Sequence, residues 1–221
     1  MEEQKSTVTF PPALRASATV FSYLLHPLFI PLLITFMVVT ALPEYFMVFK
    51  HDSIKFPFDK LYIRVGVGSL LFPLLAVVLS KLLGFVNSVQ LEERTDRIIP
   101  YVATTIFYFW AFYTFKRQGI SPGFFNAFLL GIFIAVVICF VANSFVKISM
   151  HTTGWGGVLG FLMVLMWGMG MNVSVPLALA FVLTGLAATA RLILKAHTPQ
   201  EIYTGLLVGI LSQVIAYAIV G

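Results

Sequence analysis

Seven long apolar runs limit what this chain can fold into. They cover residues 16–42, 61–85, 98–115, 124–146, 155–171, 175–194 and 202–220. Most are close to the length, about 17 to 25 residues, that a helix needs to cross a bilayer. Inside a bilayer every backbone N–H and C=O must be satisfied by the segment itself, which a helix achieves. We therefore predict an all-α bundle of about six or seven transmembrane helices, in a single domain over 1–221; the run at 155–171 is the weakest, being short and rich in glycine.

The composition agrees with a membrane protein. The chain has 221 residues, of which 59% are hydrophobic and only 10% are charged, whereas soluble domains carry about a quarter charged residues. The net charge of +5 comes from basic residues scattered over the connections, as at membrane flanks, and not from a nucleic-acid-binding face. The lone Cys139 lies inside an apolar run, which excludes a disulfide framework and a thiolate metal site. We expect the lipid bilayer as the surrounding partner and no nucleic acid.

The connection between the last two runs combines three chemically active side chains. Arg191 is followed after five residues by His197, and after three more by Glu201. At this spacing the imidazole can act as a nucleophile, the carboxylate can orient it, and the guanidinium can hold an oxyanion such as phosphate. The same stretch is also a good helix start, with Thr198 as N-cap, Pro199 at the first helical position and Glu201 completing a capping box. Both interpretations remain open.

Two further connections place polar side chains on the same face of the membrane. The second connection contains Arg94 and Arg97, and the fourth contains Ser149 and His151. With seven spans, the second, fourth and sixth connections all emerge on one face, where a shared site can form. Each group also has a plainer interpretation: a solvated charge run for the arginines, and an interfacial residue at a helix end for His151.

The connection between the last two apolar runs resembles a known phosphatase motif. The spacing of Arg191, His197 and Glu201 is similar to the third motif of the PAP2 (type 2 phosphatidic acid phosphatase) family, Arg-x5-His-x3-Asp. Glu201 stands in place of the usual aspartate, and Ala190 replaces the usual serine before the arginine.

The other two connections match the family in part and in the family's order. Ser149 and His151 keep their places in the second motif, Pro-Ser-Gly-His, although its proline and glycine are lost. The first motif, Lys-x6-Arg-Pro, is weaker: Arg97 is followed by Pro100 only three residues later, and Gln90 stands at the lysine position. The chain therefore resembles a divergent bacterial integral-membrane PAP2 phosphatase over about 92–220, whereas the spans within 1–85 are generic.

The resemblance implies metal-independent hydrolysis of a lipid phosphate monoester or diphosphate, without a cofactor. Substrates that would reach the site laterally include phosphatidic acid, phosphatidylglycerophosphate, undecaprenyl diphosphate and lipid A. Two alternatives stay open: a transporter of an anionic lipid or ion, and a catalytically inactive PAP2-like protein that binds lipid phosphates. The sequence contains no His-Glu-x-x-His, paired-aspartate cluster or glycine-rich phosphate loop, which disfavours a metal-dependent mechanism.

The resemblance also implies a role for each site residue. His197 would attack phosphorus, Glu201 would orient His197, and His151 would protonate the leaving oxygen and later activate water. The phosphate would be held by Arg191, Arg97, Arg94, Ser149 and Lys147. Lys147 would replace the missing lysine if the fourth helix continued to His151, since the two would then share a face one turn apart; a lysine that extends to the lipid headgroups is the alternative.

Two expectations concern the first span and the orientation. His26, next to Pro27, is expected to kink the helix or open it laterally, not to bind a metal. When the site candidates are left out, the site face carries four basic residues, namely Lys5, Arg15, Lys81 and Lys195. The other face carries six, namely Lys50, Lys55, Lys60, Arg64, Lys116 and Arg117. The excess favours a cytoplasmic location for the other face. The site would then face outward from a bacterial inner membrane; the oligomeric state stays open.

Overall fold

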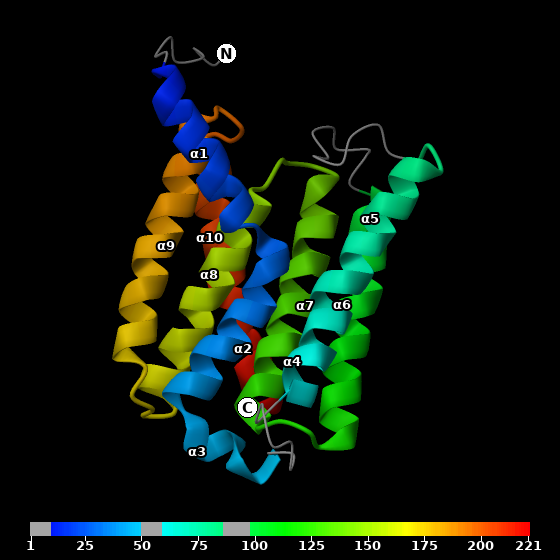
Figure 1. Ribbon diagram of the computed structural model, residues 1–221, viewed down its shortest axis with the longest axis vertical. Coiled ribbons are helices and arrows are strands. Elements are labelled where there is room, and N and C mark those ends of the chain that lie inside the picture. Colours follow the sequence, from blue (N-terminus) through cyan, green and yellow to red (C-terminus); the bar gives the residue numbers. More distant parts are fainter. Residues whose placement is uncertain (1–9, 50–58, 86–97) are drawn as a thin grey trace.

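The computed structural model describes residues 10–49, 59–85 and 98–221 (Figure 1). Throughout these residues the regular structure is helical and no strand occurs, which confirms the all-α prediction. The elements in chain order are α1 (Pro12–Leu24), η1 (Pro27–Phe29), α2 (Ile30–Ala41), α3 (Pro43–Phe46), η2 (Met47–Phe49), α4 (Asp59–Gly66), η3 (Val67–Leu71), α5 (Phe72–Leu82), α6 (Ile98–Gln118), α7 (Gly123–Asn143), α8 (Met150–Met163), η5 (Val164–Gly168), α9 (Ser174–Ile193) and α10 (Pro199–Val220).

Six helical stretches of the described chain are long and apolar enough to cross a membrane. They are Pro12–Ala41, Lys60–Leu82, Ile98–Gln118, Gly123–Asn143, Ser174–Ile193 and Pro199–Val220. The remaining predicted run, 155–171, falls on α8 and the π-helical turn η5, which lie alongside α9 and α10 (Figure 1). Most of α8 is buried by its neighbours. A helix enclosed by other helices needs less apolar surface than one that faces lipid, which explains its weak hydrophobic signal.

Glycines bring α8 and α10 into close contact. Gly156 and Gly160 of α8 and Gly205 and Gly209 of α10 each face backbone of the opposite helix or of its N-terminal cap, so closely that an added Cβ would overlap it. Both pairs have the spacing of small residues that allows two membrane helices to approach. This contact fixes the N-terminal end of α10 relative to the N-terminal end of α8, the two places where the sequence predicts catalytic residues.

The two described connections with predicted site residues lie at one end of the bundle. The link from α7 to α8 and the link from α9 to α10 meet there, beside α1 (Figure 1). The start of α6 at Ile98 is at the same end (Figure 1). The helix order along the chain therefore gathers polar segments that are about 50 residues apart in sequence.

The first span is interrupted within its length. α1 ends at Leu24, a short 3-10 turn follows from Pro27, and α2 resumes at Ile30. Pro27 has no N–H to continue the helix, and its ring restricts the conformation of His26 before it. The kink expected at His26 is therefore present, and it exposes backbone groups beside α8.

Candidate active site

His197 and Glu201 form a short hydrogen bond at the start of α10. After α9, the chain turns through Lys195, whose φ of 52° lies in the left-handed region. Thr198 then caps α10, its hydroxyl accepting from the Glu201 N–H at 3.3 Å. His197 Nδ1 lies 2.6 Å from Glu201 Oε2. The stretch is therefore a helix start and a histidine–carboxylate pair at once, because the N-cap geometry directs the Glu201 side chain back to His197.

The burial of this pair suits a nucleophilic imidazole. The His197 side chain is 5% exposed and that of Glu201 is 22% exposed. A carboxylate oxygen accepts the proton of Nδ1, so the neutral ring carries its lone pair on Nε2. Glu201 thus fixes the tautomer in which Nε2 can attack an electrophile.

Arg191 and His151 meet on one residue of the first span. Arg191, in the last turn of α9, donates from Nη1 to Ser22 Oγ at 2.8 Å. His151, in the first turn of α8, has Nε2 2.9 Å from the Ser22 carbonyl oxygen. His26 adds a second imidazole, with its ring centroid 5.2 Å from that of His151 in an edge-to-face arrangement. Four elements therefore contribute to one polar cluster at this end of the bundle.

His151 lies outside the six membrane spans, and its surroundings favour the neutral ring. Burial, followed by the charges of Arg191 and His26, lowers the pKa of His151, and the charge of His197 acts in the same direction. The charges of Arg191, His26 and His197 can act on His151 because these three side chains lie near it. A phosphate group next to Arg191 would bring negative charge, which favours the protonated imidazole.

Ser149 is fully buried and acts as the N-cap of α8. Its hydroxyl accepts from the Thr152 N–H at 3.4 Å, and its own N–H donates to the Glu201 carbonyl at 3.3 Å. Ser149 thus links the start of α8 to the start of α10. Its contact with phosphate stays a prediction, and the helix N-terminus that it caps is favourable for an anion.

The geometry expected for Lys147 is wrong. α7 ends at Asn143 in a turn, and α8 begins anew at Met150 after the cap at Ser149, so no helix connects Lys147 to His151. Local hydrogen bonding by Ser149 competes with helix continuation, which is the physical reason for the break. None of the hydrogen bonds or ion pairs among the described residues involves Lys147. Its contact with phosphate stays a prediction without the geometry that motivated it.

The remaining predicted residues, Arg94 and Arg97, lie outside the described residues, which resume at Ile98. Their proposed contact with phosphate stays a prediction. Within the part of the chain that is described, no group of three or more His, Cys, Asp or Glu side chains is arranged to hold a metal ion.

Sequence reasoning missed Ser22 and gave His26 only a mechanical role. His26 Nδ1 accepts from the Leu28 N–H at 3.3 Å, so His26 caps the turn η1, while its ring reaches His151. A signal existed: Ser22 and His26 are four residues apart beside Pro27 in an otherwise apolar run, and polar residues within a membrane span are hypotheses for a functional site. The sequence could not tell which neighbours this span contacts.

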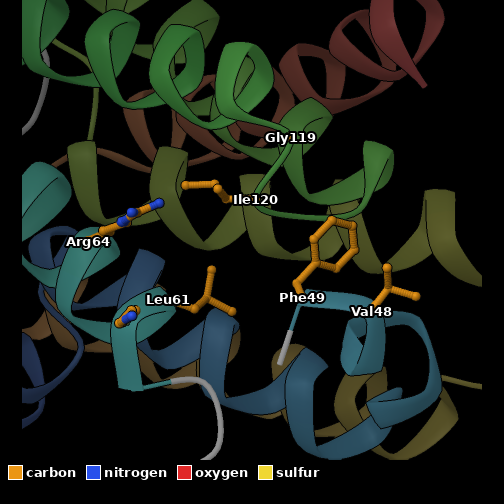
Figure 2. A pocket seen from close by; sticks show the side chains of 7 residues that line it. Val48, Phe49, Leu61, Arg64, Gly119 and Ile120 are labelled. Carbon is orange, nitrogen blue, oxygen red and sulfur yellow. The ribbon is translucent and has the colours of Figure 1, made fainter. Parts of the chain in front are cut away.

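A separate cavity of about 220 Å³ lies at the opposite end of the bundle. Figure 2 shows the residues that line it, namely Val48, Phe49, Lys60, Leu61, Arg64, Gly119 and Ile120. Arg64 donates to Gln118 Oε1 at 3.1 Å. The cavity contains none of the candidate site residues and is a different feature of the molecule.

Comparison of the chain with protein-family models, with curated proteins and with solved structures found no match. The likeness to PAP2 phosphatases therefore depends on the motifs in the sequence.

Proposed function

We propose that this protein is a membrane lipid phosphatase that hydrolyses a lipid phosphate monoester or diphosphate through a phosphohistidine intermediate. The observation that carries the proposal is the buried His197–Glu201 hydrogen bond of 2.6 Å, in the same polar cluster as Arg191 and His151. A histidine oriented by a carboxylate, next to a cation that can bind phosphate, is an arrangement suited to phosphoryl transfer.

In the first step, His197 Nε2 attacks phosphorus and forms a P–N bond. The P–O bond to the leaving group breaks, which is the lipid alcohol for a monoester and the lipid monophosphate for a diphosphate. His151 in its protonated form gives a proton to the leaving oxygen. Glu201 stabilises the positive charge that develops on His197, while Arg191 holds the phosphoryl oxygens.

In the second step, water attacks phosphorus and the P–N bond breaks. The now neutral His151 accepts a proton from this water, which regenerates the protonated imidazole. Inorganic phosphate leaves and His197 returns to its starting state. The bilayer location of the fold supports a lipid substrate, because a lipid phosphate can reach an interfacial site along the membrane surface.

The test is phosphate release by the purified protein in detergent, with phosphatidic acid and a polyprenyl diphosphate as substrates. We expect turnover by the wild type and none by His197→Ala, because the variant lacks the nucleophile. His51→Ala is the matched control and should keep wild-type turnover, because His51 is in the connection between the first two apolar runs, which holds no candidate site residue.

A direct assay for the intermediate strengthens this test. We expect His151→Ala to accumulate an acid-labile phosphate on His197 when a ³²P-labelled substrate is supplied, because the second step loses its base. Turnover of His197→Ala at the wild-type rate would contradict the proposal. Binding of the lipid phosphate without release would instead support a binding protein.

A further inference from the structure

The break in the first span leaves a backbone carbonyl without a helical donor. In a regular helix the His26 N–H would bond to the Ser22 carbonyl, four residues earlier. Here it bonds to the Tyr23 carbonyl at 3.3 Å. His151 Nε2 lies 2.9 Å from the Ser22 carbonyl oxygen and supplies the missing donor. Ser22 is 8% exposed, so this carbonyl would otherwise be buried and unsatisfied at a cost.

This contact determines where His151 carries its proton. A carbonyl oxygen can only accept, so the nitrogen that faces it, Nε2, must be the protonated one. The lone pair of the neutral ring is then on Nδ1. His197 has the complementary arrangement, with Nδ1 held by Glu201 and the lone pair on Nε2. In each histidine an acceptor therefore faces one ring nitrogen, which assigns the lone pair of the neutral ring to the other nitrogen.

The hydroxyl of Ser22 organises a second group. Arg191 Nη1 donates to Ser22 Oγ at 2.8 Å, so one residue holds both the arginine and the histidine. A hydrogen bond from a guanidinium to a buried hydroxyl restricts the orientation of a long, otherwise mobile side chain.

Neighbouring contacts keep this part of the first span in place. Trp155, one turn after His151 on α8, donates from Nε1 to the Leu25 carbonyl at 3.0 Å. The His26 ring packs against the edge or face of the His151 ring. The interrupted end of α1 is therefore held to α8 by two side chains on one helical face.

We infer that Ser22 is a positioning residue of the proposed phosphatase site: its carbonyl holds His151 with the proton on Nε2, and its hydroxyl aligns Arg191. This inference rests on the proposed function. In the first step, doubly protonated His151 gives its Nδ1 proton to the leaving oxygen and keeps the Nε2 proton on Ser22. In the second step, Nδ1 takes a proton from the attacking water.

The first test measures the tautomer and needs no turnover. The protein is labelled with ¹⁵N-histidine, placed in lipid nanodiscs at pH 7.5, and the His151 signals are identified by their loss in His151→Gln. We expect Nε2 to give the shift of a protonated nitrogen and Nδ1 that of an unprotonated one. A protonated Nδ1, or shifts averaged between the two tautomers, would overturn the inference.

The second test measures the hydroxyl. Ser22→Ala should lower kcat about tenfold to a hundredfold, the scale of losing a hydrogen bond to a charged group, while the His151 tautomer stays unchanged because the carbonyl remains. Ser22→Thr keeps the hydroxyl and should recover most of the loss. Ser17→Ala is the matched control, because Ser17 is exposed on α1 and its hydroxyl donates to the Ala13 carbonyl of its own helix.

The outcomes separate this inference from the proposed function. An active wild type in which Ser22→Ala keeps its kcat refutes the positioning role alone. A wild type without His197-dependent turnover refutes the phosphatase proposal, whereas the tautomer measurement still tests the Ser22–His151 contact. A Ser22→Ala variant that only lowers the melting temperature, at unchanged kcat, would show that Ser22 is merely structural and would also overturn the inference.

Discussion

Replacing Gly209 with alanine would force α10 away from α8. The added Cβ would overlap the Thr153 carbonyl oxygen and the Gly157 backbone nitrogen. Both are backbone atoms, which cannot rotate aside as a side chain can. To restore ordinary van der Waals contact, the two helices must separate by on the order of 1 Å. Overpacking of this kind costs about 1–3 kcal/mol, which corresponds to a fall in melting temperature of about 2–12 °C for a chain of this size.

The same displacement should impair catalysis more than stability. α10 also carries Glu201, two turns before Gly209, whereas α8 carries His151. A displacement of about 1 Å between catalytic groups can reduce the rate about a hundredfold. We therefore expect Gly209→Ala to lose about two orders of magnitude in kcat while most of the protein stays folded below its lowered melting temperature.

The assay compares melting temperature and phosphate release with those of a matched variant. Gly185→Ala, in the middle of α9, adds the same methyl group where no atom lies within 4 Å. It should keep the wild-type melting temperature or raise it, because alanine favours a helix by about 1 kcal/mol over glycine. A Gly209→Ala protein with wild-type melting temperature and kcat would refute the reasoning about the α8–α10 contact.

Two other predictions concern the carboxylate and the orientation. Glu201→Gln should lower kcat by about 10³- to 10⁴-fold, the scale of the equivalent change in a Ser-His-Asp triad. The melting temperature should change little, because the amide can keep the hydrogen bond to His197 although it cannot stabilise the positive charge on that ring. A kcat near that of the wild type would count against a catalytic role of the His197–Glu201 pair. With Cys139 buried, single cysteines at the exposed Ser144 and Asn172 report the two faces: an impermeant thiol reagent should label Ser144→Cys in intact cells and Asn172→Cys only after lysis, and the reverse pattern would place the site in the cytoplasm.

Much of the fold follows from the length of the apolar runs. The predicted run at 16–42 and the observed span Pro12–Ala41 differ only at the ends, and its interruption at His26 was visible as the dipeptide His26-Pro27. Length and hydrophobicity are properties of the segment alone, so the sequence reports them directly. The ends are less certain because they depend on capping and on neighbouring elements.

The local pattern left the end of α7 open. The apolar run that forms α7 extends to 146, and the geometry considered for Lys147 required its helix to continue to His151. Ser149 as an N-cap, with its side chain on Thr152 N–H, instead starts a new helix. Serine stabilises a helix start better than a helix interior, so the choice between the two depended on tertiary contacts of Ser149 with α10, which periodicity does not contain.

The first span shows why the full site could not be predicted. A broken helix in a membrane frees carbonyl groups, and each buried group without a donor costs several kcal/mol. Here the Ser22 and Leu25 carbonyls take their donors from His151 and Trp155 of α8, about 130 residues later in the chain. The break and the site therefore depend on each other: the interrupted span is tolerated because α8 supplies two donors, and His151 has a defined tautomer because the span is interrupted. A pattern of single segments shows the proline and the histidine separately, whereas their connection exists only in the folded bundle.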